Sequence, residues 1–224
     1  MKAGLIFTAT TPASVMAIHE ELRNRFGDEL AIIQYEDPAI LDEICERGTV
    51  TASAAARLVS MFMQSVNDGV DAMLCCCSSV GEVVDACQDL AAYVGVPILR
   101  IDEEMCRDAV RLGQRIGILA TLPTTMEPTR NTVLRAAREL DRPITLVDGL
   151  MEGAFGLPQE AFEAVICDKA SEMIDQVDVL LLAQASMACM EKLLSERFQK
   201  PVLSSPRFGA AAMAKALERS PGRG

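Results

Sequence analysis

Residues 70–79 have the sequence Val-Asp-Ala-Met-Leu-Cys-Cys-Cys-Ser-Ser, and residues 177–186 have the sequence Val-Asp-Val-Leu-Leu-Leu-Ala-Gln-Ala-Ser. The two stretches align without a gap at an offset of 107 residues. Gly-Leu-Ile-Phe-Thr at 4–8 is matched by Gly-Ile-Leu-Ala-Thr at 117–121, at an offset of 113, and Pro-Ile-Leu at 97–99 by a similar tripeptide at an offset of 104. Solenoid units repeat every ~20–50 residues, so this repeat is not one of them. It predicts two similar halves that face each other across a cleft.

Short apolar runs alternate with helical patterns along the whole chain. Strands are expected at 3–7, 31–35, 72–76, 97–101, 115–120, 144–147, 179–182 and 201–204. Helices are expected at 12–26, 51–66, 79–94, 103–114, 128–140, 159–176 and 209–217. A further helix is expected to follow the strand at 179–182 and to end at about residue 198. Apolar strands separated by helices are typical of parallel sheets that are covered on both faces. The expected fold class is therefore α/β.

The repeat divides the expected fold into two pseudo-symmetric lobes, each a mostly parallel sheet flanked by helices. The N-terminal lobe is expected to comprise residues 1–114 and to contain Cys77, and the C-terminal lobe to comprise residues 115–224 and to contain Gln184. The last strand and helix of each half are allowed to cross over to the other lobe. An active site is expected in the cleft between the lobes, where the two equivalent positions hold a thiol and an amide.

Composition excludes several classes of function. The 224 residues are 50% hydrophobic and carry a net charge of −11, which argues against nucleic-acid and anionic-membrane surfaces because both need a basic patch. No apolar run reaches the ~18 residues of a membrane span, and the N-terminus lacks the pattern of a signal peptide. Eight cysteines, three of them consecutive, do not resemble a disulfide framework, so we expect the reducing cytoplasm.

Cys77 is the leading candidate for a catalytic residue. It ends an expected strand, and ligands in parallel α/β folds bind at the carboxyl ends of the strands. Ser79 and Glu82 have the spacing of a capping box, which predicts a helix that begins at Ser79. Backbone N–H groups at such a terminus stabilise a thiolate, which suits a base or a nucleophile. Cys75 and Cys76 are expected to be small buried core residues.

The sequence gives no sign of a metal site or a nucleotide cofactor. Three consecutive cysteines cannot converge on one tetrahedral ion, and no G-x-G-x-x-G or P-loop motif follows the first strand. His19 is the only histidine and is expected on the solvated face of a helix, so Ser-His-Asp and Cys-His mechanisms have little support. The other cysteines are expected to be core or half-buried helix residues, and they are Cys45, Cys87, Cys106, Cys167 and Cys189.

Hydroxyl side chains follow the first strand and its repeat: Thr8, Thr10 and Thr11 come after the strand, and Thr121, Thr124 and Thr125 come after the repeat. In both places they precede a helix N-terminus, where hydroxyl and backbone donors can hold a carboxylate, although ordinary helix capping uses the same residues. A Gly-rich apolar segment at 149–157 is expected to form a mobile cover over the cleft or a plain surface loop. The expected substrate-binding residues are Thr8, Thr11, Ser78, Ser79, Thr121, Thr124, Ala185 and Ser186.

These motifs, in this order, resemble the cofactor-independent aspartate/glutamate racemase superfamily, which includes hydantoin racemases, maleate isomerases and arylmalonate decarboxylases. Cys-Ser-Ser at 77–79 stands where the family commonly has Cys-Asn-Thr, and residues 117–121 resemble the family strand that leads to a substrate-binding threonine. Leu-Ala-Gln-Ala-Ser-Met at 182–187 is similar to the Leu-Gly-Cys-Ala-Gly-Met loop of hydantoin-racemase-like members. The resemblance covers nearly the whole chain.

The resemblance implies proton transfer at a carbon next to a carboxylate of a small acid, without a cofactor, in a homodimer. In such racemases one cysteine removes a proton and a second delivers one from the opposite face. Here Gln184 replaces the second cysteine, and Met187 stands nearest to the position of the family's histidine. The leading interpretation is an isomerase in which Cys77 is the only acid/base and Gln184 donates a hydrogen bond to the developing negative charge.

Other interpretations stay open at this point. Within the same superfamily, Cys77 can serve a decarboxylase or a cis–trans isomerase. Outside enzyme function, the loss of one cysteine suits a carboxylate-binding protein, and the run at 75–77 suits a redox sensor.

Overall fold

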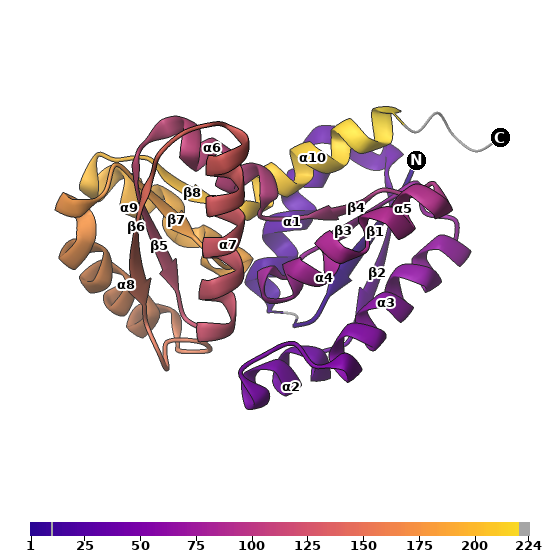
Figure 1. Ribbon diagram of the computed structural model, residues 1–224, viewed down its shortest axis with the longest axis horizontal. Helices are drawn as coiled ribbons and strands as arrows, with labels where there is room; N and C mark the ends of the chain where they lie inside the picture. Colours follow the sequence, from indigo (N-terminus) through magenta and orange to yellow (C-terminus); the bar gives the residue numbers. More distant parts are fainter. Residues whose placement is uncertain (10, 220–224) are drawn as a thin grey trace.

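Each half of the chain forms one four-stranded parallel sheet in the computed structural model, which describes residues 1–9 and 11–219 (Figure 1). The strand orders are β2-β1-β3-β4 and β6-β5-β7-β8, so the two sheets have the same topology. The strands are β1 (Lys2–Phe7), β2 (Ala31–Glu36), β3 (Ala72–Cys75), β4 (Ile98–Arg100), β5 (Arg115–Ala120), β6 (Thr145–Leu150), β7 (Val179–Leu182) and β8 (Val202–Ser204). The expected two-lobed α/β fold is confirmed.

Helices cover both faces of each sheet and enclose four apolar clusters, two in each lobe. The α-helices are α1 (Pro12–Phe26), α2 (Ala39–Arg47), α3 (Ala52–Asn67), α4 (Gly81–Ala86), α5 (Gln88–Val94), α6 (Glu103–Leu112), α7 (Pro123–Glu139), α8 (Gln159–Met173), α9 (Glu191–Phe198) and α10 (Ser205–Arg219). The 3-10 helices are η1 (Gly27–Glu29), η2 (Ser78–Val80), η3 (Ile174–Gln176) and η4 (Ala185–Met190). No helix within residues 1–9 and 11–219 is both long and apolar enough to cross a membrane.

The repeated Val-Asp pair has the same structural role in both lobes. The Asp71 carboxylate accepts a hydrogen bond from the backbone N–H of Lys2 at 2.8 Å, and the Asp178 carboxylate accepts one from Arg115 at 2.9 Å. Each aspartate thus joins the start of the third strand of its lobe to the start of the first strand. Residues that are 113 positions apart in the first strands and 107 positions apart in the third strands therefore occupy the same register positions in the two sheets.

Two helices cross between the lobes. Helix α6 follows the last strand of the first sheet, but Met105 and Ala109 pack with Ile116 and Ile118 of the second sheet. Helix α10 follows the last strand of the second sheet, but its Met213 packs in the cluster of β1 and β3 (Figure 1). Each sheet is therefore covered in part by a helix from the other half of the chain.

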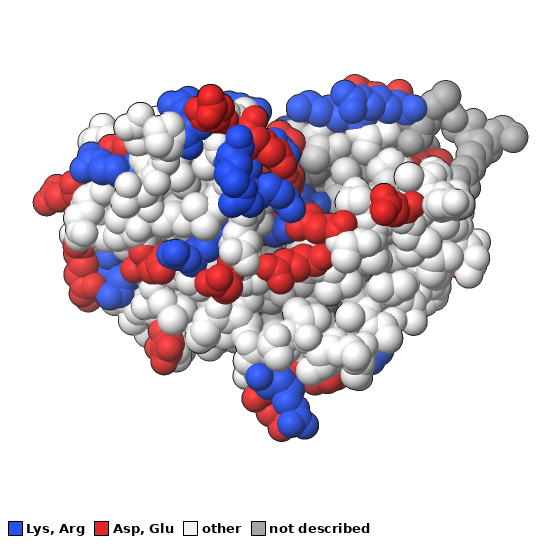
Figure 2. Space-filling view, in the orientation of Figure 1, with Lys and Arg blue, Asp and Glu red and all other residues white. Residues whose placement is uncertain are grey.

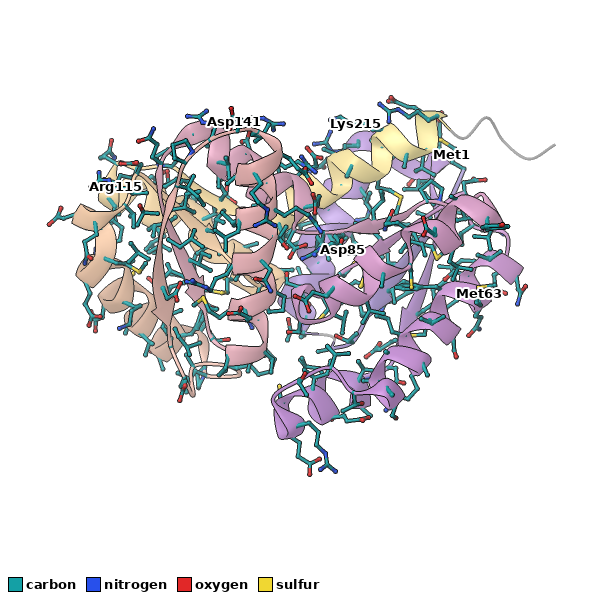
Figure 3. All side chains as sticks on the ribbon, viewed as in Figure 1. Met1, Met63, Asp85, Arg115, Asp141 and Lys215 are labelled. Atoms are coloured by element: carbon teal, nitrogen blue, oxygen red, sulfur yellow. The ribbon has the colours of Figure 1, made fainter. Side chains whose placement is uncertain are left out.

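The lobes also meet along a polar seam between α7 and the segment η2–α4. Thr125 and Ser79 share a hydrogen bond of 2.9 Å at its buried end. Arg135 of α7 reaches Asp85 at 2.7 Å, and Asp85 lies between the lobes in Figure 3. Acidic and basic side chains gather along this junction on the face shown in Figure 2. The seam fixes the segment that follows Cys77 against the second lobe.

Buried Arg100 lies beneath this seam. Its guanidinium donates to Asp102 at 2.9 and 3.0 Å and to Asp85 at 2.6 Å. A side chain at Gly81 would place its Cβ 2.4 Å from the guanidinium, which is closer than atoms can pack. Glycine is therefore needed at the first residue of α4.

Several helices differ from those expected from the sequence. Helix α2 was not expected, because its nine residues begin without a side-chain cap after Pro38. The expected helix 79–94 is divided into η2, α4 and α5, and the expected capping box is absent because the Ser79 hydroxyl bonds to Thr125. The helix expected after β7 begins instead as the 3-10 helix η4 and becomes α-helical only at Glu191.

Candidate active site

A cavity lies between the lobes at the carboxyl ends of the central strands, and the free space that water molecules can occupy within it is about 50 Å³. Both halves of the chain contribute to its wall. The lining residues are Ala9, Thr11, Ser14, Leu41, Cys76, Cys77, Ser78, Ser79, Leu122, Thr125, Phe155, Gln184, Ala185 and Ser186. The cavity therefore contains the two positions that the internal repeat makes equivalent.

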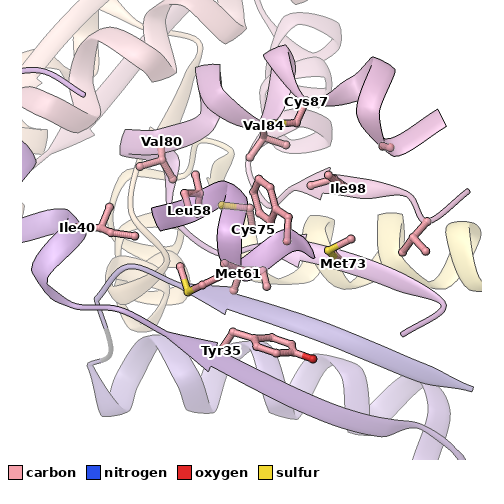
Figure 4. Packing of buried hydrophobic residues seen from close by; sticks show 14 of the residues in the cluster. Tyr35, Ile40, Leu58, Met61, Met73, Cys75, Val80, Val84, Cys87 and Ile98 are labelled. Carbon is pink, nitrogen blue, oxygen red and sulfur yellow. The ribbon is translucent and has the colours of Figure 1, made fainter. Parts of the chain in front are cut away.

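The three consecutive cysteines point into three different environments. Cys75 is 1% exposed and packs between the first sheet and its helices, among Leu58, Met73 and Val84 (Figure 4). Cys76 is buried on the opposite face of the sheet and touches the floor of the cavity. Cys77 lies beyond the end of β3, is half-buried and lines the cavity. The prediction that Cys75 and Cys76 are buried core residues is confirmed.

The environment of the Cys77 thiol acts on its pKa in two directions. Burial raises the pKa, because the cavity wall shields the thiolate from water. The Thr8 hydroxyl, the backbone N–H groups of Ser79 and Val80 and the Ser79 hydroxyl act to lower the pKa, because each can donate to the sulfur. Burial outweighs these donors, so the pKa lies above its ordinary value. The resting residue is therefore a neutral thiol, and not the thiolate expected from the helix N-terminus alone.

Two hydroxyls near Cys77 are buried without a hydrogen-bond partner among the described residues: those of Thr8 and Ser78. Thr8 is fully buried behind Cys77 and does not line the cavity, whereas Ser78 lines it. A buried hydroxyl without a hydrogen-bond partner destabilises the folded state by about 1–3 kcal/mol relative to one that has a partner. The Thr8 hydroxyl is therefore available to the Cys77 thiolate, and the Ser78 hydroxyl is available to the oxygen of a bound ligand.

Gln184 is held in one orientation by Thr121. The carbonyl oxygen Oε1 of Gln184 accepts hydrogen bonds from the backbone N–H of Thr121 at 2.7 Å and from its hydroxyl at 2.9 Å. With Oε1 bound in this way, the amide NH₂ of Gln184 is the part left to act on the cavity. Gln184 and Cys77 also share an extended backbone conformation, with φ of −122° and −132°. The two residues thus hold equivalent positions with different chemistry.

The other expected substrate-binding residues fall into two groups. Thr11, Ser79, Ala185 and Ser186 line the cavity, and Thr11 also caps α1 by accepting a hydrogen bond from the backbone N–H of Ser14 at 3.2 Å. Thr121 and Thr124 do not line it: Thr121 binds Gln184, and the hydroxyl of Thr124 is buried without a partner among the described residues.

Thr125 is one of the hydroxyl residues that follow the repeat of the first strand, and it lines the cavity. Phe155 lies in the segment 149–157 and comes from the loop between β6 and α8. This loop begins later than expected because β6 extends to Leu150. Leu41 was not expected at the cavity, because it comes from the unexpected helix α2. Its place in the wall depends on contacts between distant parts of the chain, and no local pattern marks it.

Three predictions outside the cavity also need correction. His19 is half-buried, and its Nε2 is shielded from solvent without a hydrogen-bond partner among the described residues, so it does not lie on a solvated face. Cys45 and Cys189 are exposed, and neither belongs to the core. Within residues 1–9 and 11–219, no three His, Cys, Asp or Glu side chains gather in a way that can hold a metal ion.

Comparisons with solved structures identify the fold. The chain is similar to a glutamate racemase from Bacillus anthracis, with a TM-score of 0.74, 15% identity and coverage of 98% of this chain and 82% of the other. It is similar to the aspartate racemase of Picrophilus torridus, with a TM-score of 0.68, 17% identity and coverage of 97% and 94%. An allantoin racemase from Klebsiella pneumoniae gives a TM-score of 0.64 at 18% identity, with coverage of 98% and 88%.

Sequence comparison leads to the same group of enzymes. No functionally curated protein matches the chain. Residues 4–213, however, match the Asp/Glu/hydantoin racemase family. The match includes both sheets and every residue that lines the cavity. The chain is a member of the Asp/Glu/hydantoin racemase family.

Proposed function

We propose that this protein transfers a proton at the carbon next to the carboxylate or carbonyl of a small acid, hydantoin or related compound, with Cys77 as the only acid/base. The observation that carries the proposal is the pair of equivalent positions in one cavity, Cys77 on the first lobe and Gln184 on the second. A thiol can exchange a proton near neutral pH, and an amide cannot. The chemistry is therefore expected to occur on one face of the substrate.

The proposed reaction has two steps. The Cys77 thiolate removes the proton from carbon, and the electron pair of the C–H bond moves onto the carbonyl to form an enolate. Ser78 and the amide NH₂ of Gln184 donate hydrogen bonds to the enolate oxygens, where the negative charge develops. The Cys77 thiol then returns a proton to the same face, which restores the thiolate. Return to the same carbon exchanges the proton with solvent and retains the configuration, whereas delivery to another carbon of a conjugated enolate gives the isomer.

The test is hydrogen–deuterium exchange on single enantiomers. We would incubate the protein in heavy water with separate D and L forms of amino acids, hydroxy acids and substituted hydantoins, and follow the label by NMR and the configuration by chiral chromatography. One enantiomer of the substrate is expected to take up deuterium without inversion. Rapid racemisation by the unmodified protein would contradict a single-face mechanism. Thermal stabilisation by a compound that takes up no label would instead support a carboxylate-binding protein.

The pH dependence of this exchange follows from the raised pKa of Cys77. Only the thiolate can remove the proton, and its fraction grows tenfold per pH unit below the pKa. We therefore expect kcat/KM for exchange to rise tenfold per unit from neutral pH up to the raised pKa of the thiol, and then to level off. The measurement is a pH–rate profile, compared with the rate at which iodoacetamide alkylates Cys77 over the same range. A profile that is already level at neutral pH would contradict the assignment.

A decarboxylase of the same family is the second candidate. The raised pKa of Cys77 favours it, because a decarboxylase needs a protonated thiol that delivers a proton to the enolate left by loss of CO₂. Its pH profile has the opposite sign, level at neutral pH and falling as the thiol ionises. Measurement of CO₂ release from substituted malonates distinguishes this reaction from exchange.

We also propose that the protein acts in the reducing cytoplasm. All eight cysteines lie in the described residues, and none is joined in a disulfide. Disulfides persist in oxidising compartments, and a free catalytic thiol is protected where glutathione and thioredoxin keep thiols reduced.

A further inference from the structure

The cavity wall contains both polar and apolar side chains. Cys77, Ser78 and Gln184 follow the ends of the central strands β3 and β7. Leu41, from helix α2 at the lower edge of Figure 1, and Phe155 are apolar residues of the same wall. A substrate whose carbonyl group is held by the polar donors would therefore have apolar side chains within the same cavity for its neighbouring substituent.

The apolar part of the wall comes from both lobes. Leu41 is 7% exposed and belongs to the first lobe. Leu122 directly precedes α7, and Phe155 lies on the loop after β6, so both belong to the second lobe. A substituent between them would be covered from two sides. Burial of an apolar substituent there is favourable, whereas an unpaired charge in the same place would lose its hydration.

The cavity wall contains no charged side chain among the described residues. The chain has 53 charged residues among 224, yet the described residues that line this cavity are all uncharged. Their polar groups are hydroxyls, thiols and one amide. Neutral donors of this kind can hold one carboxylate or an imide ring. The wall supplies no countercharge for a second carboxylate or an ammonium group on the substituent.

Phe155 is the side chain best placed to respond to a substituent. It is 41% exposed, although it faces the cavity. Gly153 and Gly156 flank it with φ of +79° and +80°, a backbone conformation that glycine adopts without strain. An exposed aromatic ring gains apolar contact when a ligand fills the space beside it. Contact with a bound substituent therefore accounts for the position of Phe155 at the cavity, whereas packing within the protein does not.

We propose that the substrate carries an uncharged, apolar alkyl or aryl group on the reacting carbon, and that Phe155 selects this group together with Leu41 and Leu122. The inference rests on the proposed function, because it takes the reacting carbon to lie beside Cys77 and Gln184. It distinguishes this chain from enzymes that act on dicarboxylates such as aspartate and glutamate. The same substituent can be carried by an amino acid or by a hydantoin ring, and separate probes distinguish these two sources.

The first test compares matched probes. One pair is benzylhydantoin and carboxymethylhydantoin, and the other is phenylalanine and aspartate, each supplied as single enantiomers. Both binding, measured as thermal stabilisation, and deuterium exchange would be recorded. The apolar member of at least one pair is expected to be favoured by about tenfold or more, since small differences in an apolar pocket give 10–200-fold discrimination. The pair that responds identifies the ring or the open-chain substrate.

The second test uses variants of the loop that follows β6. Phe155→Ala is expected to weaken binding of the apolar probe by about tenfold and to leave the carboxymethyl or aspartate probe nearly unchanged. Phe155→Arg is expected to reverse the preference, because the guanidinium supplies a countercharge. Leu157→Ala is the matched control: Leu157 lies on the same loop and is 39% exposed, but it does not line the cavity. This control is expected to change neither probe.

The outcomes separate this inference from the proposed function. Binding of the apolar probe without exchange would contradict the reaction and leave the substituent assignment intact. Exchange that favours the carboxymethyl probe or aspartate would support the reaction and overturn the assignment. Failure of both apolar probes to bind, or an equal loss of all probes in Phe155→Ala, would also overturn it.

Discussion

Replacement of Gln184 by cysteine is expected to give this protein the ability to racemise its substrate. The substitution places a thiol at the position equivalent to Cys77, in a backbone of the same extended conformation. The Thr121 N–H and hydroxyl that now bind the Gln184 carbonyl would then face the new sulfur, where they favour the thiolate. Proton removal on one face and proton delivery on the other would invert the carbon.

The expected size of this effect is large. Positioned acid–base groups contribute about 10²–10⁴-fold, so inversion in Gln184→Cys should exceed that of the unmodified protein by about 100-fold or more. Chiral chromatography of one enantiomer over time measures it directly. Gln184→Ser is the matched control, because a hydroxyl has nearly the size of a thiol but does not ionise near neutral pH. Equal inversion by the cysteine and serine variants would show that no second acid/base is involved.

Loss of the Cys77 thiol is expected to abolish proton exchange. Cys77→Ser preserves the volume of the side chain, and the half-buried position tolerates a hydroxyl because Thr8 and Ser79 are adjacent. The serine hydroxyl is too weak an acid to form the base, so exchange should fall by about 10²–10⁴-fold. The thermal midpoint should change little, because Cys77 is only packed against the edge of the core.

Cys189→Ser provides the control for this experiment. Cys189 is exposed and lies outside the cavity, so exchange should be preserved when it is replaced. Mass spectrometry after alkylation would show which thiol reacts in the unmodified protein. Cys77→Ser that keeps most of the exchange activity would mean that another residue moves the proton.

The sequence was sufficient for the fold because its decisive signals were local or repeated. The run Val-Asp followed by apolar residues predicted β3 and β7, and both strands occupy the same place in their sheets. Alternation along a strand predicted that consecutive cysteines have different environments, and Cys75 and Cys76 do lie on opposite faces. Patterns of this kind depend only on neighbours in the chain or on the copy in the other half.

The details of the site depended on contacts between distant residues. Ser79 has the local spacing of a capping residue, but its hydroxyl forms a hydrogen bond with Thr125, which is 46 positions away. Thr121 was expected to bind substrate, and its donors are used by Gln184, 63 positions away. The pKa of Cys77 is likewise governed by burial, which the tertiary structure creates and a helix terminus alone does not reveal. Such competition between local and tertiary partners is invisible in a single sequence.

The exchange of α6 and α10 between the lobes has a consequence for the ancestry of the chain. A half-length polypeptide with this topology would leave part of one face of its sheet uncovered, because the helix that follows its last strand covers the other sheet. Two identical copies that traded these helices would cover both sheets and form a closed twofold dimer. Such a dimer has two identical residue positions in its central cavity. Once the copies are joined in one gene, each position can change independently. One cavity can then present the Cys77 thiol to one side of a molecule and the Gln184 amide to the other.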